Sequence, residues 1–358
     1  MGMNEQHPPA APSLDDLAVY ALDAHEPAEE PGIAAYLDTV PGAARWERTL
    51  RDVAGELAAA TGPETGLPAD LAARVRRAAT ERRPPAPTTS GASPIEVHRV
   101  ELSRTVLLLS DLRPGDWARP VDPPELAGWT VHDVAVHVMA NESLLADRLG
   151  DPVPGVVETR RDNVGRTAEA RARHRGLPPA AAIVELEAAA EAVDTAVTTR
   201  GPAGLDDRIE WWGGPSALRV LLLVRAFESW THSDDIRRAL GMPELPPPPR
   251  SMTTMASRAC GFVPSLLAAR GAHHPGRVLR LRFPDLDPVA AWDVDLGVVG
   301  STRPAGDSGA DAELTMTALA FCRGLSDRLP RDGVVYEATG DTALADEVVD
   351  ALPALAFL

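Results

Sequence analysis

The sequence predicts a multidomain α+β protein: a small N-terminal helical domain, a four-helix bundle, and a C-terminal domain that mixes helices and strands. Two proline-rich stretches, at 84–91 and 246–249, are typical of linkers and separate three segments. In the middle segment, apolar residues recur at helical spacing in four stretches. After Pro275 the apolar residues instead alternate with charged ones, as in a strand with one buried face.

The linkers set the expected domain boundaries. Residues 1–13 are polar and proline-rich, so we expect a disordered tail. Residues 14–85 are rich in alanine and helical in pattern, which predicts the small helical domain. A linker at 86–93 leads to the four-helix bundle at 94–245, and the C-terminal α+β domain occupies 251–358.

Prolines, glycines and capping residues mark the ends of the bundle helices. We expect these helices at residues 94–112, 131–149, 178–197 and 215–240. Long connections at 151–176 and 201–214 join the second helix to the third and the third to the fourth. Bundles of this kind build metal sites from side chains on facing helices.

The C-terminal domain should contain both strands and helices. Its strands are expected at 278–283, 292–296 and 312–316, and its helices at 251–269, 317–327 and 343–352.

Composition restricts the partners and the compartment. The net charge of −17 disfavours nonspecific binding to nucleic acid or to an anionic membrane. We find no apolar core of a signal peptide and no apolar run of transmembrane length, so we expect a cytoplasmic protein. Cys260 and Cys322 have no metal-binding spacing and lie in apolar helical segments, so we expect unreactive core thiols.

The fourth bundle helix carries a carboxylate and an imidazole one turn apart. Glu228 and His232 are four residues apart and therefore share a helix face. Two such donors can chelate one divalent metal ion, but the same pair also occurs as a solvated Glu/His contact. Both interpretations stay open for the pair alone.

The second bundle helix supplies a third candidate ligand. Thr130 is expected to cap this helix, with Asp133 at its third position. His137 then lies on the apolar stripe with Val134 and Val138, where it is either a core histidine or a ligand. Two imidazoles and one carboxylate on two helices favour a Zn²⁺ site with open positions, and suit Ni²⁺ or Fe²⁺ less selectively.

Together these motifs resemble the DinB and mycothiol-dependent maleylpyruvate isomerase superfamily, over about residues 92–358. The motifs are Trp129-Thr130-Val131 followed by His137, then Glu228-x-x-x-His232 and Asp235-Ile236-Arg237. The resemblance implies that His137, Glu228 and His232 bind a divalent metal, expected to be Zn²⁺. It also implies mycothiol, the actinobacterial counterpart of glutathione, as the thiol cosubstrate. The implied activity is that of an isomerase or S-transferase acting on a small acidic or electrophilic substrate.

The C-terminal domain resembles that of the same isomerases, including its closing stretch Thr339–Ala345. In that family this domain supplies an arginine to the active-site cleft. Arg328 and Arg323 are the catalytic candidates here, with the role of binding a substrate carboxylate.

Two acidic residues near the ligands have open roles. Asp235, near His232, either orients that ligand or serves the packing of the bundle. Glu142, near His137, either lines the cleft or is solvated.

Residues 14–85 resemble the small zinc-binding anti-sigma domain, on the basis of the helical stretches at 17–23 and 33–37. In that family a His-x-x-x-Cys-x-x-Cys motif binds zinc, but the matching positions here hold Tyr36, Val40 and Ala43, which cannot. The resemblance implies a sigma factor as a partner of residues 14–85. The alternative function is therefore an anti-sigma-like transcriptional regulator whose metal-bearing bundle acts as a sensor.

Overall fold

The structure is a computed structural model that describes Arg51 and residues 91–357, apart from short gaps at 124–125, 157–159, 161, 212–213, 287 and 307–308. The chain divides into two compact units, Met1–Thr88 and Thr89–Leu358, and nearly all described residues belong to the second. The predicted tail and, except for Arg51, the predicted anti-sigma-like domain lie outside the described residues, so both stay predictions.

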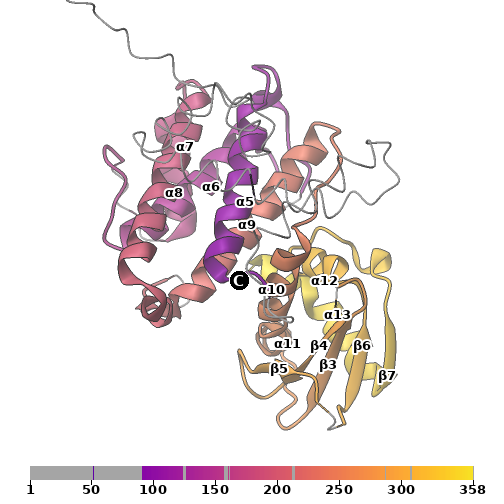
Figure 1. The fold of residues 1–358 in the computed structure, drawn as a ribbon. Coiled ribbons are helices and arrows are strands. Elements are labelled where there is room, and N and C mark those ends of the chain that lie inside the picture. Colours follow the sequence, from indigo (N-terminus) through magenta and orange to yellow (C-terminus); the bar gives the residue numbers. More distant parts are fainter. Residues whose placement is uncertain are drawn as a thin grey trace, which may run out of the picture. The chain divides into compact units, whose positions relative to one another are not determined.

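The four predicted bundle helices are present (Figure 1). They are α5 (Pro94–Ser110), α6 (Val131–Arg148), α8 (Ala180–Arg200) and α9 (Leu218–Ala239). Helix α5 packs on α9 and α6 packs on α8, and α6 also contacts α9. This last contact joins the two helices that carry the predicted metal ligands.

One helix of this region was not predicted. Helix α7 (Asn163–His174) lies inside the stretch that we expected to be a polar connection, so that expectation was wrong here. Asp162 caps the helix by accepting a hydrogen bond from the Gly165 N–H at 2.7 Å. Helix α7 packs on α6 and buries polar side chains, including Thr167 and His174. A helix whose buried face is polar has no apolar stripe by which to recognise it.

Short elements complete the bundle and its connections. A hairpin of β1 (Arg208–Ile209) and β2 (Ser216–Ala217) precedes α9, which therefore begins three residues later than expected. Short 3₁₀ helices occur at Asp116–Ala118 (η1), Pro202–Asp206 (η3), Arg331–Gly333 (η4) and Leu352–Phe357 (η5).

The C-terminal domain contains a mixed sheet with helices packed on it (Figure 1). The sheet order is β5-β4-β3-β6-β7, with β3 and β6 parallel and the other neighbours antiparallel. Its strands are β3 (Val278–Phe283), β4 (Ala290–Asp295), β5 (Thr302–Pro304), β6 (Ala312–Thr315) and β7 (Glu337–Gly340). Its helices are α10 (Pro249–Cys260), α11 (Val263–Ala269), α12 (Ala318–Leu325) and α13 (Thr342–Ala351).

The predicted α+β class is confirmed, with differences in detail. All three predicted strands are present, and the sheet has two more, β5 and β7, of three and four residues. Their sequences, Thr302-Arg303-Pro304 and Glu337-Ala338-Thr339-Gly340, contain no large apolar residue alternating with polar ones, whereas β6, which is equally short, contains Leu314. The helix expected at 251–269 is two helices, because α10 ends at Cys260 and α11 begins at Val263.

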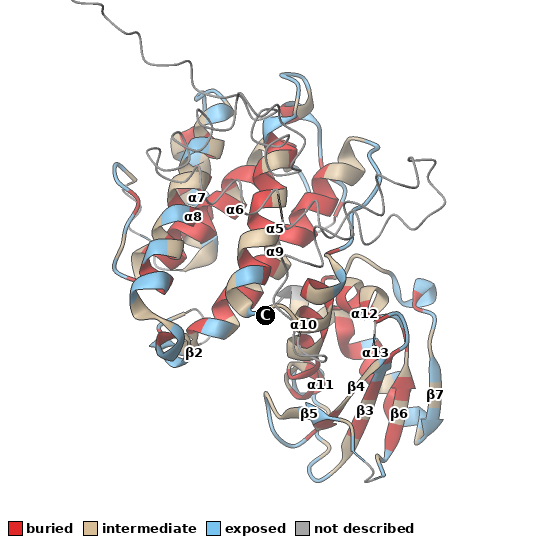
Figure 2. Cartoon of the chain, viewed as in Figure 1, coloured by how far each residue is buried: buried red, intermediate tan, exposed pale blue. Residues whose placement is uncertain are grey.

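One apolar core extends from the sheet into the bundle. Leu279, Leu281 and Phe283 of β3 are buried on one face of the sheet, among residues of α10, α11, α12 and α13. The same core includes Leu223 and Trp230 of α9. Figure 2 shows buried residues along both α9 and the central strands. The bundle and the C-terminal domain therefore share apolar packing as well as a linker.

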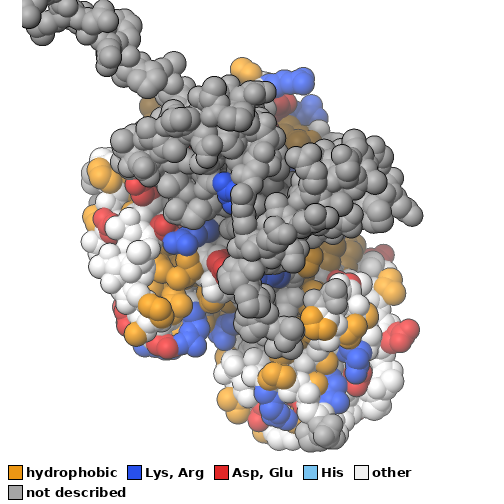
Figure 3. Space-filling model, viewed as in Figure 1, with side chains coloured by type: hydrophobic (Ala, Val, Ile, Leu, Met, Phe, Trp, Pro, Cys, Tyr) orange, Lys and Arg blue, Asp and Glu red, His pale blue; other side chains and the backbone are white. Residues whose placement is uncertain are grey.

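Basic and acidic side chains are interspersed over the described surface in the view of Figure 3. In the described part of the chain, no helix is long and apolar enough to cross a membrane.

The first turn of α6 is fixed by a capping box, as predicted. Thr130 Oγ1 accepts from the Asp133 N–H at 3.3 Å, and the Asp133 carboxylate accepts from the Thr130 N–H at 2.9 Å. The predicted role of Asp133 at the helix start is therefore confirmed. The cap matters for the site because α6 carries His137.

Replacing Thr130 with alanine should lower the free energy of unfolding by about 1 kcal/mol, because the Asp133 N–H loses its partner. The variant Thr130→Ser retains a hydroxyl and should retain most of the stability. Urea denaturation compares the two. Equal losses would show that the threonine methyl group, rather than the hydroxyl, stabilises this helix start.

Glu101 on α5 is a buried carboxyl group with one cationic partner. It is 1% exposed and accepts from Arg104 Nη1 at 3.1 Å. Burial raises the pKa of Glu101 to about 7, although Arg104 opposes the rise. An unfolded glutamate titrates near pH 4.5, so the folded chain binds this proton more tightly. Its contribution to stability is complete below pH 4.5 and is lost as the pH rises through about 7.

The free energy of unfolding should therefore fall between about pH 4.5 and 7, with at most about 3 kcal/mol from Glu101. In Glu101→Gln this fall should be smaller, because the glutamine side chain does not ionise as the pH rises. Denaturant titrations at pH 5 and 7.5 measure it. The exposed control Glu191→Gln should match the wild type. A pH dependence unchanged in Glu101→Gln would contradict the assignment.

Candidate metal centre

The three predicted ligands converge where α6 faces α9. His137 comes from α6, and Glu228 and His232 come from α9. One donor atom from each residue lies within 4.8 Å of the others. His137 Nε2 and Glu228 Oε1 are 2.8 Å apart, and the rings of His137 and His232 are 4.9 Å apart between centroids. The structure thus brings together side chains that are about ninety residues apart in sequence.

The cluster is shielded but can still be reached from solvent. The side chains of His137, Glu228 and His232 are 15%, 23% and 10% exposed. This partial exposure allows a small ligand to contact them, whereas most of each side chain is fixed by packing.

Two polar neighbours fix His137. Thr167 of α7 lies with Oγ1 at 2.9 Å from His137 Nδ1. Asn141, one turn along α6, donates to Glu228 Oε1 at 3.1 Å and also contacts the His137 ring. A hydrogen bond at Nδ1 fixes the orientation of the ring. It leaves Nε2 as the nitrogen that faces the cluster and could ligate a metal ion.

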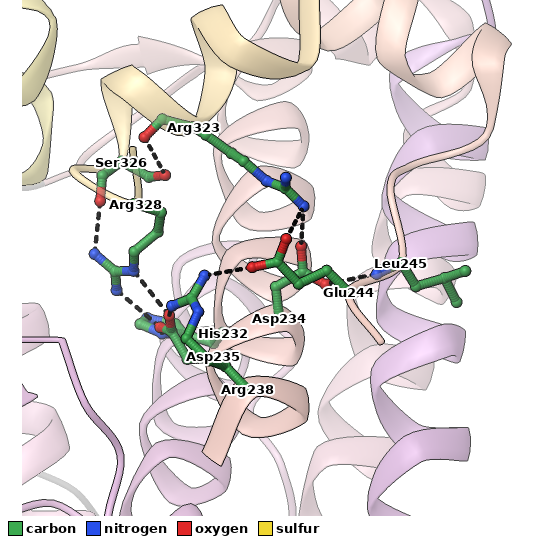
Figure 4. Close-up of polar contacts among 9 residues, drawn as sticks. All are labelled: His232, Asp234, Asp235, Arg238, Glu244, Leu245, Arg323, Ser326 and Arg328. Carbon is green, nitrogen blue, oxygen red and sulfur yellow. Dashed lines mark hydrogen bonds and ion pairs between the residues drawn. The ribbon is translucent and has the colours of Figure 1, made fainter. Parts of the chain in front are cut away.

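His232 is fixed by Asp235. The Asp235 carboxylate accepts from His232 Nδ1 at 3.0 Å and is itself 1% exposed (Figure 4). The contacts of Asp235 agree with both roles left open for it, because the same carboxylate also accepts two hydrogen bonds from Arg328. A carboxylate behind a ligating histidine sets its tautomer and strengthens it as a donor.

Both candidate arginines of the C-terminal domain bind carboxylates of α9 (Figure 4). Arg328 donates to both oxygens of Asp235, each at 2.8 Å. Arg323 pairs with Asp234 at 3.3 Å and with Glu244 at 2.7 Å. Asp235 thus connects Arg328 to the candidate ligand His232. That either arginine also binds a substrate carboxylate stays a prediction.

Arg225 connects the cluster to the interior of the bundle. Its side chain is completely buried, donates to Val138 O at 3.0 Å, and pairs with Glu228 and with Glu142. Glu142 also accepts from His98 Nε2 at 2.9 Å and has no exposed surface. Of the two alternatives left open for Glu142, solvation is excluded, because the carboxylate is buried and paired with Arg225 and His98.

The electrostatics favour metal-binding protonation states. Burial lowers the pKa of His137, which keeps the imidazole neutral near pH 7. Burial alone would raise the pKa of Glu228, but Arg225, His137 and His232 outweigh it and hold the pKa well below its usual value. A neutral imidazole and an ionised carboxylate are the forms that bind metal ions.

The donor set fits a divalent transition metal. In a tetrahedral zinc site the ligand atoms lie about 2.0–2.2 Å from the ion, and hence about 3.3–3.6 Å from one another. His137 Nε2 and Glu228 Oε1, now hydrogen-bonded at 2.8 Å, would separate only slightly to reach that spacing. Three protein ligands leave a position open for a small molecule, as in catalytic zinc sites.

Neither cysteine takes part. Cys260 and Cys322 are both completely buried, and burial raises the pKa of both thiols. They are the unreactive core thiols that the sequence predicted. A thiolate at this site would therefore have to come from another molecule.

Sequence reasoning missed three residues around the ligands. Two of them could have been found from helical spacing. Asn141 lies four residues after His137, and Arg225 lies three residues before Glu228, so each shares a helix face with a candidate ligand. Thr167 could not have been found in this way, because its helix was not predicted.

Comparison with known proteins matches part of the chain to a protein family. Residues 98–237 match the family model described as the mycothiol maleylpyruvate isomerase N-terminal domain. The matched domain extends from α5 into α9 and contains all three clustered residues, and it bears out the resemblance drawn from the motifs for this part of the chain. The N-terminal anti-sigma resemblance has no such match. A search of curated proteins finds no match.

Two solved structures are also similar. They are the mycothiol-dependent maleylpyruvate isomerase and a mutant of it in which one histidine is replaced by alanine. Each is 19% identical and covers 68% of this chain and 91% of its own, with TM-scores of 0.45 and 0.46.

Removing the charge behind His232 should weaken metal binding. We expect Asp235→Asn to raise the Kd for Zn²⁺ by about 10- to 100-fold, because His232 loses its orienting carboxylate. Competition with a chromophoric chelator measures this Kd.

Asp234→Asn is the matched control, because Asp234 is a neighbouring buried carboxylate that pairs with Arg323 rather than with a ligand. Its Kd should change by no more than about twofold. Equal weakening in both variants would mean that attachment of the C-terminal domain, rather than ligand orientation, governs metal affinity.

Proposed function

We propose that this chain is a metal-dependent and thiol-dependent isomerase or S-transferase that acts on a small acidic or electrophilic substrate. The observation that carries the proposal is the convergence of His137, Glu228 and His232 on one point inside a matched isomerase domain. The family name supplies the thiol, mycothiol, and the substrate class, an unsaturated keto acid.

His137, Glu228 and His232 would hold the ion, with Zn²⁺ as the best fit to two imidazoles and a carboxylate. When bound, such an ion lowers the pKa of a coordinated thiol and polarises a carbonyl oxygen. The chain's own residues prepare the site. Thr167 and Asp235 fix the two rings, and Arg225 keeps Glu228 ionised.

The thiol has a defined chemical task in isomerisation. A thiolate that adds to a carbon–carbon double bond converts it to a single bond, about which the product can rotate. Departure of the same thiolate restores the double bond in the other geometry, so no net oxidation occurs. In S-transfer the carbon–sulfur bond is retained instead. The buried cysteines cannot supply this sulfur, which supports an external thiol cosubstrate.

An acidic substrate needs a cationic partner in the cleft. Arg328 and Arg323 remain the proposed catalytic arginines, and both lie beside the ligand helix α9. Because Arg328 already binds Asp235, any contact it makes with substrate would use a guanidinium whose orientation that carboxylate has fixed.

The regulatory alternative stays a prediction from sequence. It depends on a sigma factor binding to residues 14–85, which apart from Arg51 lie outside the described residues.

The decisive variant is His137→Ala. Purified wild-type protein should contain about one divalent ion per chain and isomerise maleylpyruvate only when mycothiol is present. The variant should lose most of the metal and at least about 100-fold in kcat/KM, because two ligands hold an ion poorly. Elemental analysis and a thiol-dependent turnover assay measure the two effects.

His273→Ala is the control, because His273 is an exposed loop histidine distant in sequence from the cluster. It should behave as the wild type in both assays. Equal metal content in wild type and His137→Ala would refute the metal site. A metal-bound protein without thiol-dependent turnover would refute the enzymatic role and leave the metal site standing.

A further inference from the structure

A buried chain of polar side chains leads from α5 to the candidate metal centre. It begins at His98, which is 5% exposed and pairs with Glu142 of α6. Glu142 in turn pairs with Arg225 of α9, and Arg225 pairs with the candidate ligand Glu228. His98 is therefore three polar contacts away from the cluster, on a helix that carries none of the three candidate ligands.

The hydrogen bond between His98 and Glu142 has a defined direction. Burial alone would raise the pKa of Glu142, but His98 and Arg225 outweigh it and lower the pKa, so the carboxylate stays ionised. An ionised carboxylate only accepts hydrogen bonds. The 2.9 Å contact between His98 Nε2 and Glu142 Oε1 is therefore donated by the imidazole, whose proton lies at Nε2.

This N–H determines how the Arg225 guanidinium is shared. One oxygen of Glu142 accepts from His98, and the other accepts from Arg225 Nε at 3.3 Å. The two terminal nitrogens of the guanidinium then donate elsewhere, Nη1 to Glu228 and Nη2 to Val138 O. The guanidinium thus spans two carboxylates instead of pairing fully with one of them.

Loss of the His98 donor would change this division. Glu142 Oε1 would remain buried without a partner, which is unfavourable. A guanidinium readily binds both oxygens of one carboxylate through two parallel N–H groups. Arg225 would therefore turn toward Glu142 and loosen its hold on Glu228, whose Oε1 lies 2.8 Å from His137 Nε2.

We propose that His98 is a positioning residue for the candidate metal centre. By occupying one oxygen of Glu142, it directs Arg225 toward Glu228. That carboxylate is then held in the orientation in which it meets the two histidines of the cluster. The proposal rests on the proposed function, because the ion that His98 serves belongs to that site.

Zinc affinity distinguishes two substitutions of His98. Glutamine can place an amide N–H close to the position of the imidazole Nε2–H, whereas leucine fills the space without a donor. His98→Leu should raise the Kd for Zn²⁺ about tenfold, and His98→Gln should stay within about threefold of the wild type. Competition with a chromophoric chelator measures these Kd values.

Thr105→Val is the matched control. It removes another buried polar contact between α5 and α9, that of Thr105 Oγ1 with Ser233 Oγ at 2.8 Å, and leaves the chain from Glu142 to Glu228 intact. Its Kd should change by no more than about twofold. Equal weakening in Thr105→Val and His98→Leu would show that the packing of α5 on α9 governs the affinity, and would overturn the proposal.

Cobalt substitution gives a readout that a merely structural role would not change. The visible absorption of bound Co²⁺ depends on the geometry of its ligands. The spectrum of Co²⁺-loaded His98→Leu should differ from that of the wild type, because Glu228 is held differently, and His98→Gln should restore it. Identical spectra and equal Kd values for zinc in all three chains would refute the positioning role.

The metal-free chain separates this proposal from the proposed function. Because His137 contacts Glu228 directly, its ring ¹⁵N resonances report on that carboxylate without any ion. His98→Leu should shift them, and His98→Gln should not. If the wild type binds no zinc but the resonances shift in this pattern, the proposed function fails and the coupling of His98 to Glu228 stands. Zinc binding by the wild type, with resonances unchanged in His98→Leu, would overturn the positioning role alone.

Discussion

The ion pairs of the buried Arg225 guanidinium are the interaction on which the geometry of the candidate metal centre depends. It lies between Glu142 of α6 and Glu228 of its own helix, and has no exposed surface. A charge taken out of water is tolerated only where every donor is engaged, so α6 and α9 must keep one register. That register places His137 opposite Glu228 and His232. A protein in which apolar residues replace a buried ion pair is often as stable as the original. The presence of Arg225 is therefore better explained by its pairing with Glu228, which positions that carboxylate and keeps it ionised, than by a contribution to folding stability.

The ion pair between Asp235 and Arg328 joins the C-terminal domain to the site. Asp235 is one turn from His232 and almost completely buried, so its charge has to be neutralised within the protein. Arg328 supplies this neutralisation through two hydrogen bonds from the other domain. The orientation of His232, a candidate ligand on the bundle, therefore depends on a residue nearly a hundred positions away in the sequence. The apolar core shared by the two domains also holds Arg328 in position beside Asp235.

The sequence was sufficient for those parts of the site that local rules govern. The spacing of Glu228 and His232 follows from helix geometry, and Thr130 fixes the start of the helix that carries His137. It was insufficient where a partner comes from elsewhere in the chain. Thr167 lies on a helix whose buried face is polar, so periodicity could not reveal it. Arg328 could be nominated as an arginine of the right domain, but its contact with Asp235 is a property of the tertiary fold alone. The short strands β5 and β7 were missed because pairing with β4 and β6, rather than their own pattern, makes them strands.

The charges around the candidate metal centre determine which small molecule would bind at the coordination position that the protein leaves open. The chain carries a net charge of −17, which at long range repels an acidic substrate or a thiolate. At physiological ionic strength that field is screened beyond about 8 Å, so the local charges decide. Arg225 is shared between Glu142 and Glu228, and Arg328 is paired with Asp235, so Glu228 is the one carboxylate among the three candidate ligands. In the proposed function, a divalent ion held by one carboxylate and two imidazoles would retain a net positive charge in a partly buried site. Such a centre would attract one anion, whereas two anions, a thiolate and a carboxylate, would give it a net negative charge. The acidic end of the proposed substrate would then need a separate cation, and this is the physical reason to look for that cation among the arginines of the C-terminal domain.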